Sequence, residues 1–176
     1  MKVATLALLV LLLGAGGSAA QPRNDFLLVL DKRAGPYRYL TSFKKGVGDY
    51  PPAVAAFGRP SSVRDCWATW RAAGISVYFV NPERCTPQAL ASQPVLWYGM
   101  RLFDRRWHTT RGIHVGQPEA EVRRIYPDAR LDRNTRPPQL VLVHHRIDEF
   151  DFTALAVTIG RDGRVATIEV PPQWIY

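Results

Sequence analysis

The feature that most constrains this chain is a helix signature that occurs twice, each time followed by strand-like sequence. In the longer copy, residues 107–127, a strand end and a turn marked by Gly112 precede a short amphipathic helix that a proline stops. The shorter copy, residues 48–60, has a helix of similar length that ends in Gly-Arg-Pro. Helices this short bury their apolar stripe only against another layer, here a sheet. The pattern therefore predicts an α+β protein of two tandem helix-plus-antiparallel-sheet units, residues 21–104 and 105–176.

Local signals set the limits of the two helices. Asp49 is suited to cap a helix over residues 51–57, which Gly58 and Pro60 end. In the second copy, Pro118 suits the first helical position, because its missing N–H has no partner there in any case. The stripe expected to face the sheet follows at helical spacing: Val122, Ile125 and Tyr126.

Strand-like segments fill most of both units. Apolar alternation and β-branched or aromatic content predict strands over residues 26–30, 37–40, 66–70, 75–80 and 95–103, and then over 139–147, 152–159 and 165–170. The strands at 66–70 and 75–80 form a predicted hairpin, and Asp162-Gly163 marks the turn of another. Residues 130–138 read as a polar loop. The even spread of apolar residues over 95–103 also fits a buried helix.

The first 20 residues have the composition of a secretory signal peptide. Lys2 is followed by an apolar run from Leu6 to Leu13 and then by small residues up to Ala20. This run is shorter than the roughly 20 residues that span a bilayer. We expect cleavage after Ala20, a secreted or cell-envelope location outside the cytoplasm, and no stable membrane insertion of the mature chain. The alternative is an N-terminal helix that tethers the protein to a membrane.

The mature chain retains two cysteines, Cys66 and Cys85. In an oxidising compartment, an even number of cysteines favours a disulfide over a metal site or a nucleophile. The bond would close a loop of about 20 residues and contribute about 3 kcal/mol in the chain-entropy model.

The chain is basic, and arginine supplies most of its positive charge. Nineteen Arg and four Lys face 15 acidic residues, and loss of Lys2 with the leader lowers the formal net charge from +8 to +7. Arginine binds carboxylates and phosphates in a bidentate manner and stacks on aromatic rings. A protein partner or an anionic polymer of the cell envelope fits this composition, and so does plain solubility. The charges form no dense tract, and export argues against nucleic acid.

Motifs for enzymatic or metal chemistry are weak. The chain has no Gly-x-Ser-x-Gly, no glycine-rich phosphate loop and no His-x-x-x-His. His144 and His145 are adjacent on a predicted strand and point to opposite faces, so they cannot hold one metal ion together. The carboxylates within residues 148–151 read as a solvated hairpin tip, because the ligand spacing of a calcium loop is missing. We expect no catalytic residue, metal or cofactor; a small hydrolase whose site assembles from distant residues is the alternative.

Aromatic residues interleaved with arginine are the strongest binding signal. Trp, Tyr and Arg dominate binding hot spots, and a sheet face that no helix covers can present them to a partner. The residues predicted to bind are Trp67, Trp70, Tyr78, Trp97, Arg101 and Trp107. The alternative is that most of these rings form the core between sheet and helices.

One segment resembles a known family. Val115-Gly-Gln-Pro-Glu-Ala-Glu-Val122 is similar to the helix start Val-Gly-polar-x-x-x-x-Val of the beta-lactamase inhibitory protein repeats, and Cys66 is placed as in those repeats. Residues 107–116 also resemble a Trp-x-Thr-x-x-Gly-Ile/Leu-x-Val-Gly segment of secreted bacterial proteins. The resemblance covers residues 40–172 and implies a tandem repeat with a concave, enzyme-gripping sheet face. The second unit departs from it by having no cysteine, and the positive charge departs from it too.

These observations favour a secreted, non-enzymatic, inhibitor-like binding protein that uses an aromatic and arginine sheet face on a protein partner. The alternative is an electrostatic binder of an anionic cell-envelope polymer, whose affinity would fall as salt screens the charge.

Overall fold

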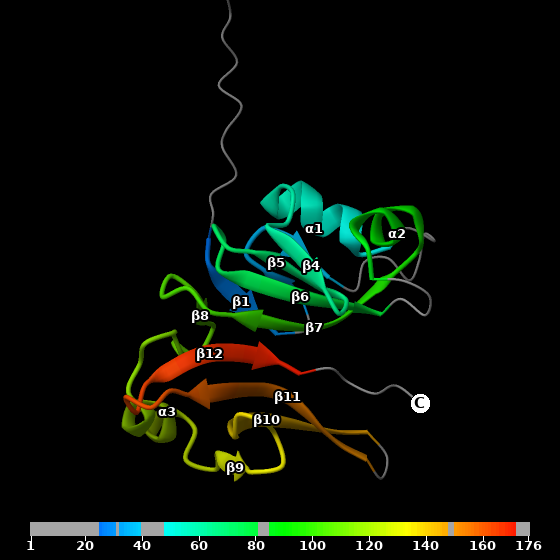
Figure 1. Cartoon of the computed structure of the whole chain (residues 1–176). Coiled ribbons are helices and arrows are strands. Elements are labelled where there is room, and N and C mark those ends of the chain that lie inside the picture. Colours follow the sequence, from blue (N-terminus) through cyan, green and yellow to red (C-terminus); the bar gives the residue numbers. More distant parts are fainter. Residues whose placement is uncertain (1–24, 31, 40–47, 81–84, 148–149, 172–176) are drawn as a thin grey trace, which may run out of the picture.

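The computed structural model describes residues 25–30, 32–39, 48–80, 85–147 and 150–171 (Figure 1). The expected signal peptide, and Asp148 and Glu149 of the carboxylate cluster, lie outside these residues. The described chain is mixed α+β and mostly sheet, which confirms the predicted fold class at this level. None of its helices has the length and apolarity needed to cross a membrane.

The larger of two sheets has eight strands, all antiparallel to their neighbours. Their order is β4 (Ser62–Arg64), β5 (Trp67–Trp70), β6 (Ile75–Val80), β7 (Leu96–Leu102), β12 (Val165–Val170), β11 (Phe150–Ile159), β10 (Gln139–Ile147) and β9 (Arg130–Asp132). In each half the first strand, β4 or β9, forms an outer edge of the sheet, and the last strand, β7 or β12, lies in its middle. The two halves meet where β7 pairs with β12, with Arg101 opposite Glu169.

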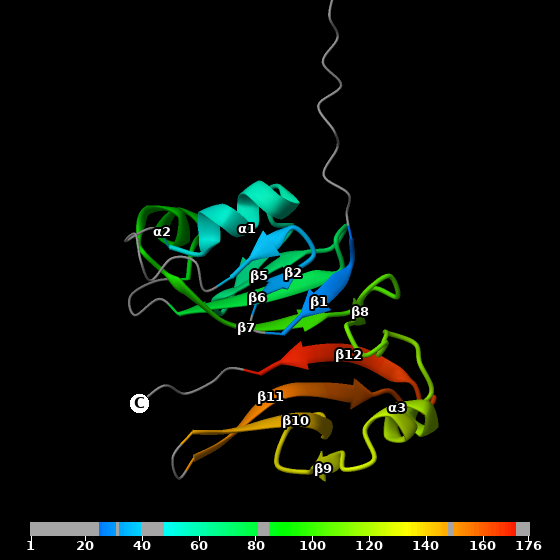
Figure 2. The same ribbon diagram turned by 180° about the vertical axis from the view of Figure 1, so that it is seen from behind.

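The smaller sheet has the order β3 (Tyr37–Arg38), β2 (Arg33–Ala34), β1 (Leu27–Val29) and β8 (His108–Thr109). β1 and β8 run parallel, whereas the other pairs are antiparallel. The helices are α1 (Tyr50–Phe57), α2 (Pro87–Ser92) and α3 (Glu119–Ile125). The small sheet lies behind the first half of the large sheet in Figure 1 and in front of it in Figure 2.

Every predicted strand has a counterpart in the structure, and the strands that were not predicted are short. The predicted strands at 139–147 and 165–170 coincide with β10 and β12, and 95–103 is the strand β7 rather than a buried helix. The prediction of a polar loop over 130–138 is wrong at its start, because Arg130–Asp132 pairs with β10 as β9. The sequence reading did not include β4 or α2.

Asp49 stands at the start of α1 but does not cap it with its side chain. Its Oδ2 instead accepts a hydrogen bond from the backbone N–H of Trp97 at 3.0 Å, and its own N–H donates to Val95 O at 2.7 Å. Asp49 is thus the N-cap residue, as predicted, but its buried carboxylate bonds to the backbone of β7 instead of to the helix. In the second copy Pro118 is the N-cap, so α3 begins one residue later than predicted.

One core runs under both halves of the large sheet. Side chains of α1, the small sheet and α3 pack on the same face, and Val122 of α3 is fully buried there. Trp107 is the largest fully buried side chain, and its indole Nε1–H donates to Ala73 O at 2.7 Å. The helix stripe predicted from residues 122–126 is thus confirmed, since Tyr126 is also buried and Ile125 packs against the core.

The predicted disulfide between Cys66 and Cys85 is confirmed. Asp65 and Cys66 form the two-residue turn between β4 and β5, and both have positive φ angles, of 48° and 62°. Turns of this kind match the twist of a hairpin. The disulfide therefore ties the tip of the β4–β5 hairpin to the chain just before α2.

Candidate functional site

The two faces of β5, β6 and β7 carry different side chains, because successive residues of a strand point to opposite sides. One row is buried against the helices and the small sheet: Ala68, Trp70, Ile75, Val77, Phe79, Met100 and Leu102. The opposite row carries Trp67, Thr69, Ser76, Tyr78 and Arg101, which are half-buried or exposed. We call this second side of the large sheet the open face.

Three aromatic rings and one guanidinium group meet on the open face, and we call them the aromatic cluster. The ring centroids of Trp67 and Tyr78 are 5.3 Å apart, and those of Tyr78 and Tyr98 are 6.1 Å apart. The Cζ atom of Arg101 lies 4.5 Å from the centroid of the Trp67 ring, a cation–π distance. The cluster therefore presents flat apolar surface and a positive charge side by side.

Glu169 lies at the centre of the large sheet and fixes one side of the aromatic cluster. Its carboxylate is buried and accepts hydrogen bonds from four groups, at distances of 2.8 to 3.1 Å. The donors are Arg101 Nε, Gln139 Nε2, Thr158 Oγ1 and Thr167 Oγ1. A buried carboxylate is tolerated when its lone pairs are satisfied in this way. On the open face, the hydrogen bonds of Glu169 therefore link side chains of four adjacent strands, β7, β12, β11 and β10.

An open hollow of about 470 Å³ lies beside the cluster at the β4 edge of the sheet, and we call it the β4 groove. Its lining residues are Ser62, Val63, Arg64, Asp65, Trp67, Thr69, Arg71, Ser76 and Arg101. The hydroxyl oxygens of Thr69 and Ser76 are 2.8 Å apart on its floor. The described residues of the lining supply three guanidinium groups and one carboxylate, so an anionic ligand suits the groove.

The structure divides the six predicted binding residues between two environments. Trp67, Tyr78 and Arg101 lie together on the open face. Trp70 and Trp107 are 2% and 0% exposed in the core, and the Nε1–H of each donates to a backbone carbonyl. They cannot touch a partner from there, so for these two the predicted binding role is wrong.

Trp97, another predicted binding residue, also lies outside the candidate site. Its ring packs on the core side against Tyr39, with centroids 4.4 Å apart, and its buried Nε1 has no hydrogen-bond partner among the described residues. Strand alternation separates Trp67 from Trp70, because residues three apart in a strand point to opposite faces. The predicted binding residues do not include Tyr98 or Glu169; an acidic residue between Ile168 and Val170 in an apolar strand is the available signal for Glu169.

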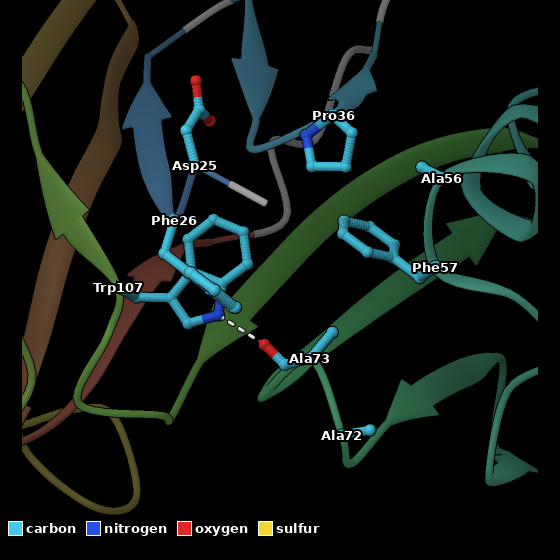
Figure 3. A pocket seen from close by; sticks show the side chains of 8 residues that line it. All are labelled: Asp25, Phe26, Pro36, Ala56, Phe57, Ala72, Ala73 and Trp107. Atoms are coloured by element: carbon cyan, nitrogen blue, oxygen red, sulfur yellow. Dashed lines mark hydrogen bonds between the residues drawn. The ribbon is translucent and has the colours of Figure 1, made fainter. Parts of the chain in front are cut away.

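A second, smaller hollow of about 160 Å³ opens between the small sheet and the C-terminal end of α1 (Figure 3). Phe26, Phe57, Pro36 and Trp107 give it apolar walls. Asp25 stands at its rim, where the Arg33 guanidinium holds the pKa of this carboxyl below its ordinary value. With its one carboxylate already paired, the hollow offers packing surface and no reactive group.

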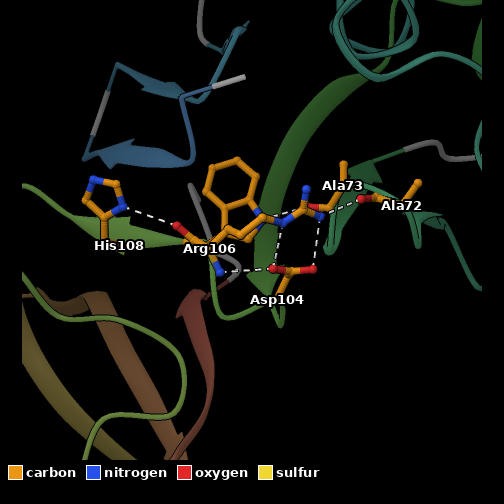
Figure 4. Close-up of polar contacts among 6 residues, drawn as sticks. Ala72, Ala73, Asp104, Arg106 and His108 are labelled. Carbon is orange, nitrogen blue, oxygen red and sulfur yellow. Dashed lines mark hydrogen bonds and ion pairs between the residues drawn. The ribbon is translucent and has the colours of Figure 1, made fainter. Parts of the chain in front are cut away.

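The polar cluster next to this hollow is structural (Figure 4). The Asp104 carboxylate accepts hydrogen bonds from the backbone N–H and the guanidinium of Arg106, whose Nη2 also donates to Ala72 O at 2.7 Å. Hydrogen bonding to Arg106 lowers the pKa of Asp104. The Nδ1 atom of His108 lies within hydrogen-bonding distance of Arg106 O, at 3.2 Å. Among the described residues, no group of three or more His, Cys, Asp or Glu has the arrangement of a metal site.

No protein-family model matches the chain, and no curated protein or solved structure is significantly similar to it. What the open face does is therefore inferred from its own chemistry.

Proposed function

We propose that the protein is a secreted, non-enzymatic binding protein whose open face docks on a protein partner. The observation that carries this proposal is the aromatic cluster, in which Trp67, Tyr78 and Arg101 share one solvent-facing patch. These are the residue types that contribute most to protein–protein affinity. Both rings are braced by neighbours, so little side-chain freedom is lost on binding.

We also propose that the two halves are related as tandem units of the beta-lactamase inhibitory protein type. In each half a helix, α1 or α3, precedes four strands of the large sheet, and these strands follow one another from an outer edge to the middle. In this arrangement the open face spans both units. The disulfide supports an extracytoplasmic location, because such bonds persist in oxidising compartments.

The test compares variants of the mature protein, residues 21–176, immobilised and exposed to the secreted and envelope fractions of the source cells. Trp67→Ala removes the central ring of the patch, whereas Leu131→Ala removes an exposed apolar side chain on the far edge strand β9. We expect one partner protein to remain bound to the immobilised wild type and to Leu131→Ala through a high-salt wash. Trp67→Ala should weaken its binding by more than about 30-fold, the usual effect of a hot-spot residue. Equal retention by all three proteins would refute the proposal.

A second candidate function is electrostatic binding of an anionic envelope polymer. Arg105, Arg164 and His114 line another open hollow, of about 500 Å³, at the turn before α3. Among the described residues of its lining, Val115 is the one apolar side chain that could hold a protein side chain. This function predicts capture that disappears in high salt and that Arg105→Gln weakens, whereas Trp67→Ala leaves it unchanged.

A further inference from the structure

We propose that the guanidinium group of Arg101 is a carboxylate-binding site, which receives an aspartate or glutamate side chain from an acidic segment of the partner protein. This inference rests on the proposed docking function and names the chemistry of one contact within it.

The guanidinium of Arg101 is held at two points. Its Nε–H donates to Glu169 at 3.1 Å, and its Cζ lies over the Trp67 ring, 4.5 Å from the ring centroid. Glu169 is itself fixed by its three other donors. These two contacts restrict the guanidinium group before any ligand arrives, which reduces the entropy lost on binding.

The terminal nitrogens of Arg101 are left for a ligand. Neither Nη atom donates a hydrogen bond to another residue of the described chain, and 49% of the side chain is exposed. Other arginines differ: Arg33, Arg106 and Arg164 each use an Nη atom on a protein oxygen. Two parallel Nη–H donors match the two oxygens of a carboxylate, a geometry that lysine cannot provide.

The surroundings favour a carboxylate on an apolar stem. Arg64 and Arg71 line the same groove, and Asp65 is the one acidic residue among the described residues of its lining. The positive potential therefore attracts an anion. Trp67 and Val63 add apolar surface beside the two Nη atoms of Arg101. The methylene groups of Asp or Glu can pack on this surface, whereas a phosphate chain has no apolar group to pack there. This difference favours an acidic protein segment over an anionic polymer.

The experiment titrates the mature protein with acetyl-hexaglutamate amide, with acetyl-hexaglutamine amide as the uncharged control. Arginine side-chain N–H signals are followed by NMR at fixed ionic strength. Arg101→Gln removes the fork but keeps an amide donor for Glu169, and Arg101→Lys keeps the charge. Arg161→Gln, in the exposed β11–β12 turn, removes one positive charge elsewhere. Urea unfolding midpoints within error of the wild type establish that each variant is folded.

We expect hexaglutamate to shift the Arg101 signals and hexaglutamine to leave them unchanged. Both Arg101 variants should bind hexaglutamate about tenfold more weakly, because each loses the paired donors. Arg161→Gln should weaken binding less than twofold. Equal weakening by Arg101→Gln and Arg161→Gln would overturn the proposal, since charge alone would then explain binding. Tighter, Arg101-dependent binding of a linear hexaphosphate would also overturn it and would favour an anionic polymer.

The same variants separate this inference from the proposed function. If Trp67→Ala abolishes partner capture but the Arg101 variants bind hexaglutamate as the wild type does, the carboxylate site is refuted and the docking face is supported. If hexaglutamate binding requires Arg101 while Trp67→Ala captures the partner normally, the docking face is refuted.

Discussion

Replacing Glu169 with alanine tests whether the buried carboxylate holds the large sheet together. The change leaves four donors, on β7, β10, β11 and β12, without their acceptor. Hydrogen bonds to a charged group are worth about 1.5–3 kcal/mol each, although they are not additive and the freed donors partly regain water. Removing one member of a buried charged network typically costs about 3–5 kcal/mol. We expect a loss of that size in the free energy of unfolding.

For a chain of this length, 1 kcal/mol lowers the melting temperature by roughly 2–4 °C, so Glu169→Ala should melt roughly 6–20 °C below the wild type. The assay is thermal and urea unfolding followed by circular dichroism. The matched control is Glu119→Ala, which removes an exposed carboxylate paired with Arg123 on α3 and should cost less than about 0.5 kcal/mol. A loss below about 1 kcal/mol for Glu169→Ala would refute the assignment of Glu169 as the central acceptor.

Three further predictions concern stability. Gly74 has φ +63°, and an added Cβ would lie 2.1 Å from the Cβ of Asp104; Gly74→Ala should cost about 2–5 kcal/mol in urea unfolding, whereas Gly58→Ala, with open space around it, should cost only about 1–2. Changing Cys66 and Cys85 together to alanine should cost about 3 kcal/mol, and an unchanged urea midpoint would contradict the disulfide's role. The lowered pKa of Asp104 means that its ion pair stabilises the fold above its ordinary pKa of 3.8 and is lost as the pH falls through the lower, folded-state pKa. Asp104→Asn should therefore flatten the decline in stability below about pH 4 and cost less than about 1 kcal/mol at pH 7; an unaltered acid decline would refute this.

The long strands could be predicted from the sequence because their apolar content is intrinsic to each segment. Residues 139–147 and 165–170 are rich in β-branched and aliphatic side chains. β4 and β9 have three residues each and are largely exposed. Such segments become strands only because a longer neighbour pairs with them, which is information held elsewhere in the chain.

The candidate site could be predicted only in part. Strand alternation separates Trp67 from Trp70 on sequence grounds alone, but which of the two faces stays open depends on where α1 and the small sheet pack. The pairing of Arg101 with Glu169 joins residues 68 positions apart. Each was visible as a lone charge between apolar neighbours, Met100 and Leu102 for the one and Ile168 and Val170 for the other, yet nothing local indicates that the two strands adjoin.

The parallel pairing of β1 with β8 has a consequence for the order of folding. Leu27 lies beside His108, which is 81 residues later in the chain. Short antiparallel ribbons such as β1–β3 are marginally stable without further strands or a packed face. During synthesis from the N-terminus, β1 therefore cannot pair with β8 until residue 109 has been added. The small sheet that packs against Trp107 can be completed only then. Contacts of such long range slow folding, so we expect the small sheet to be completed late in folding.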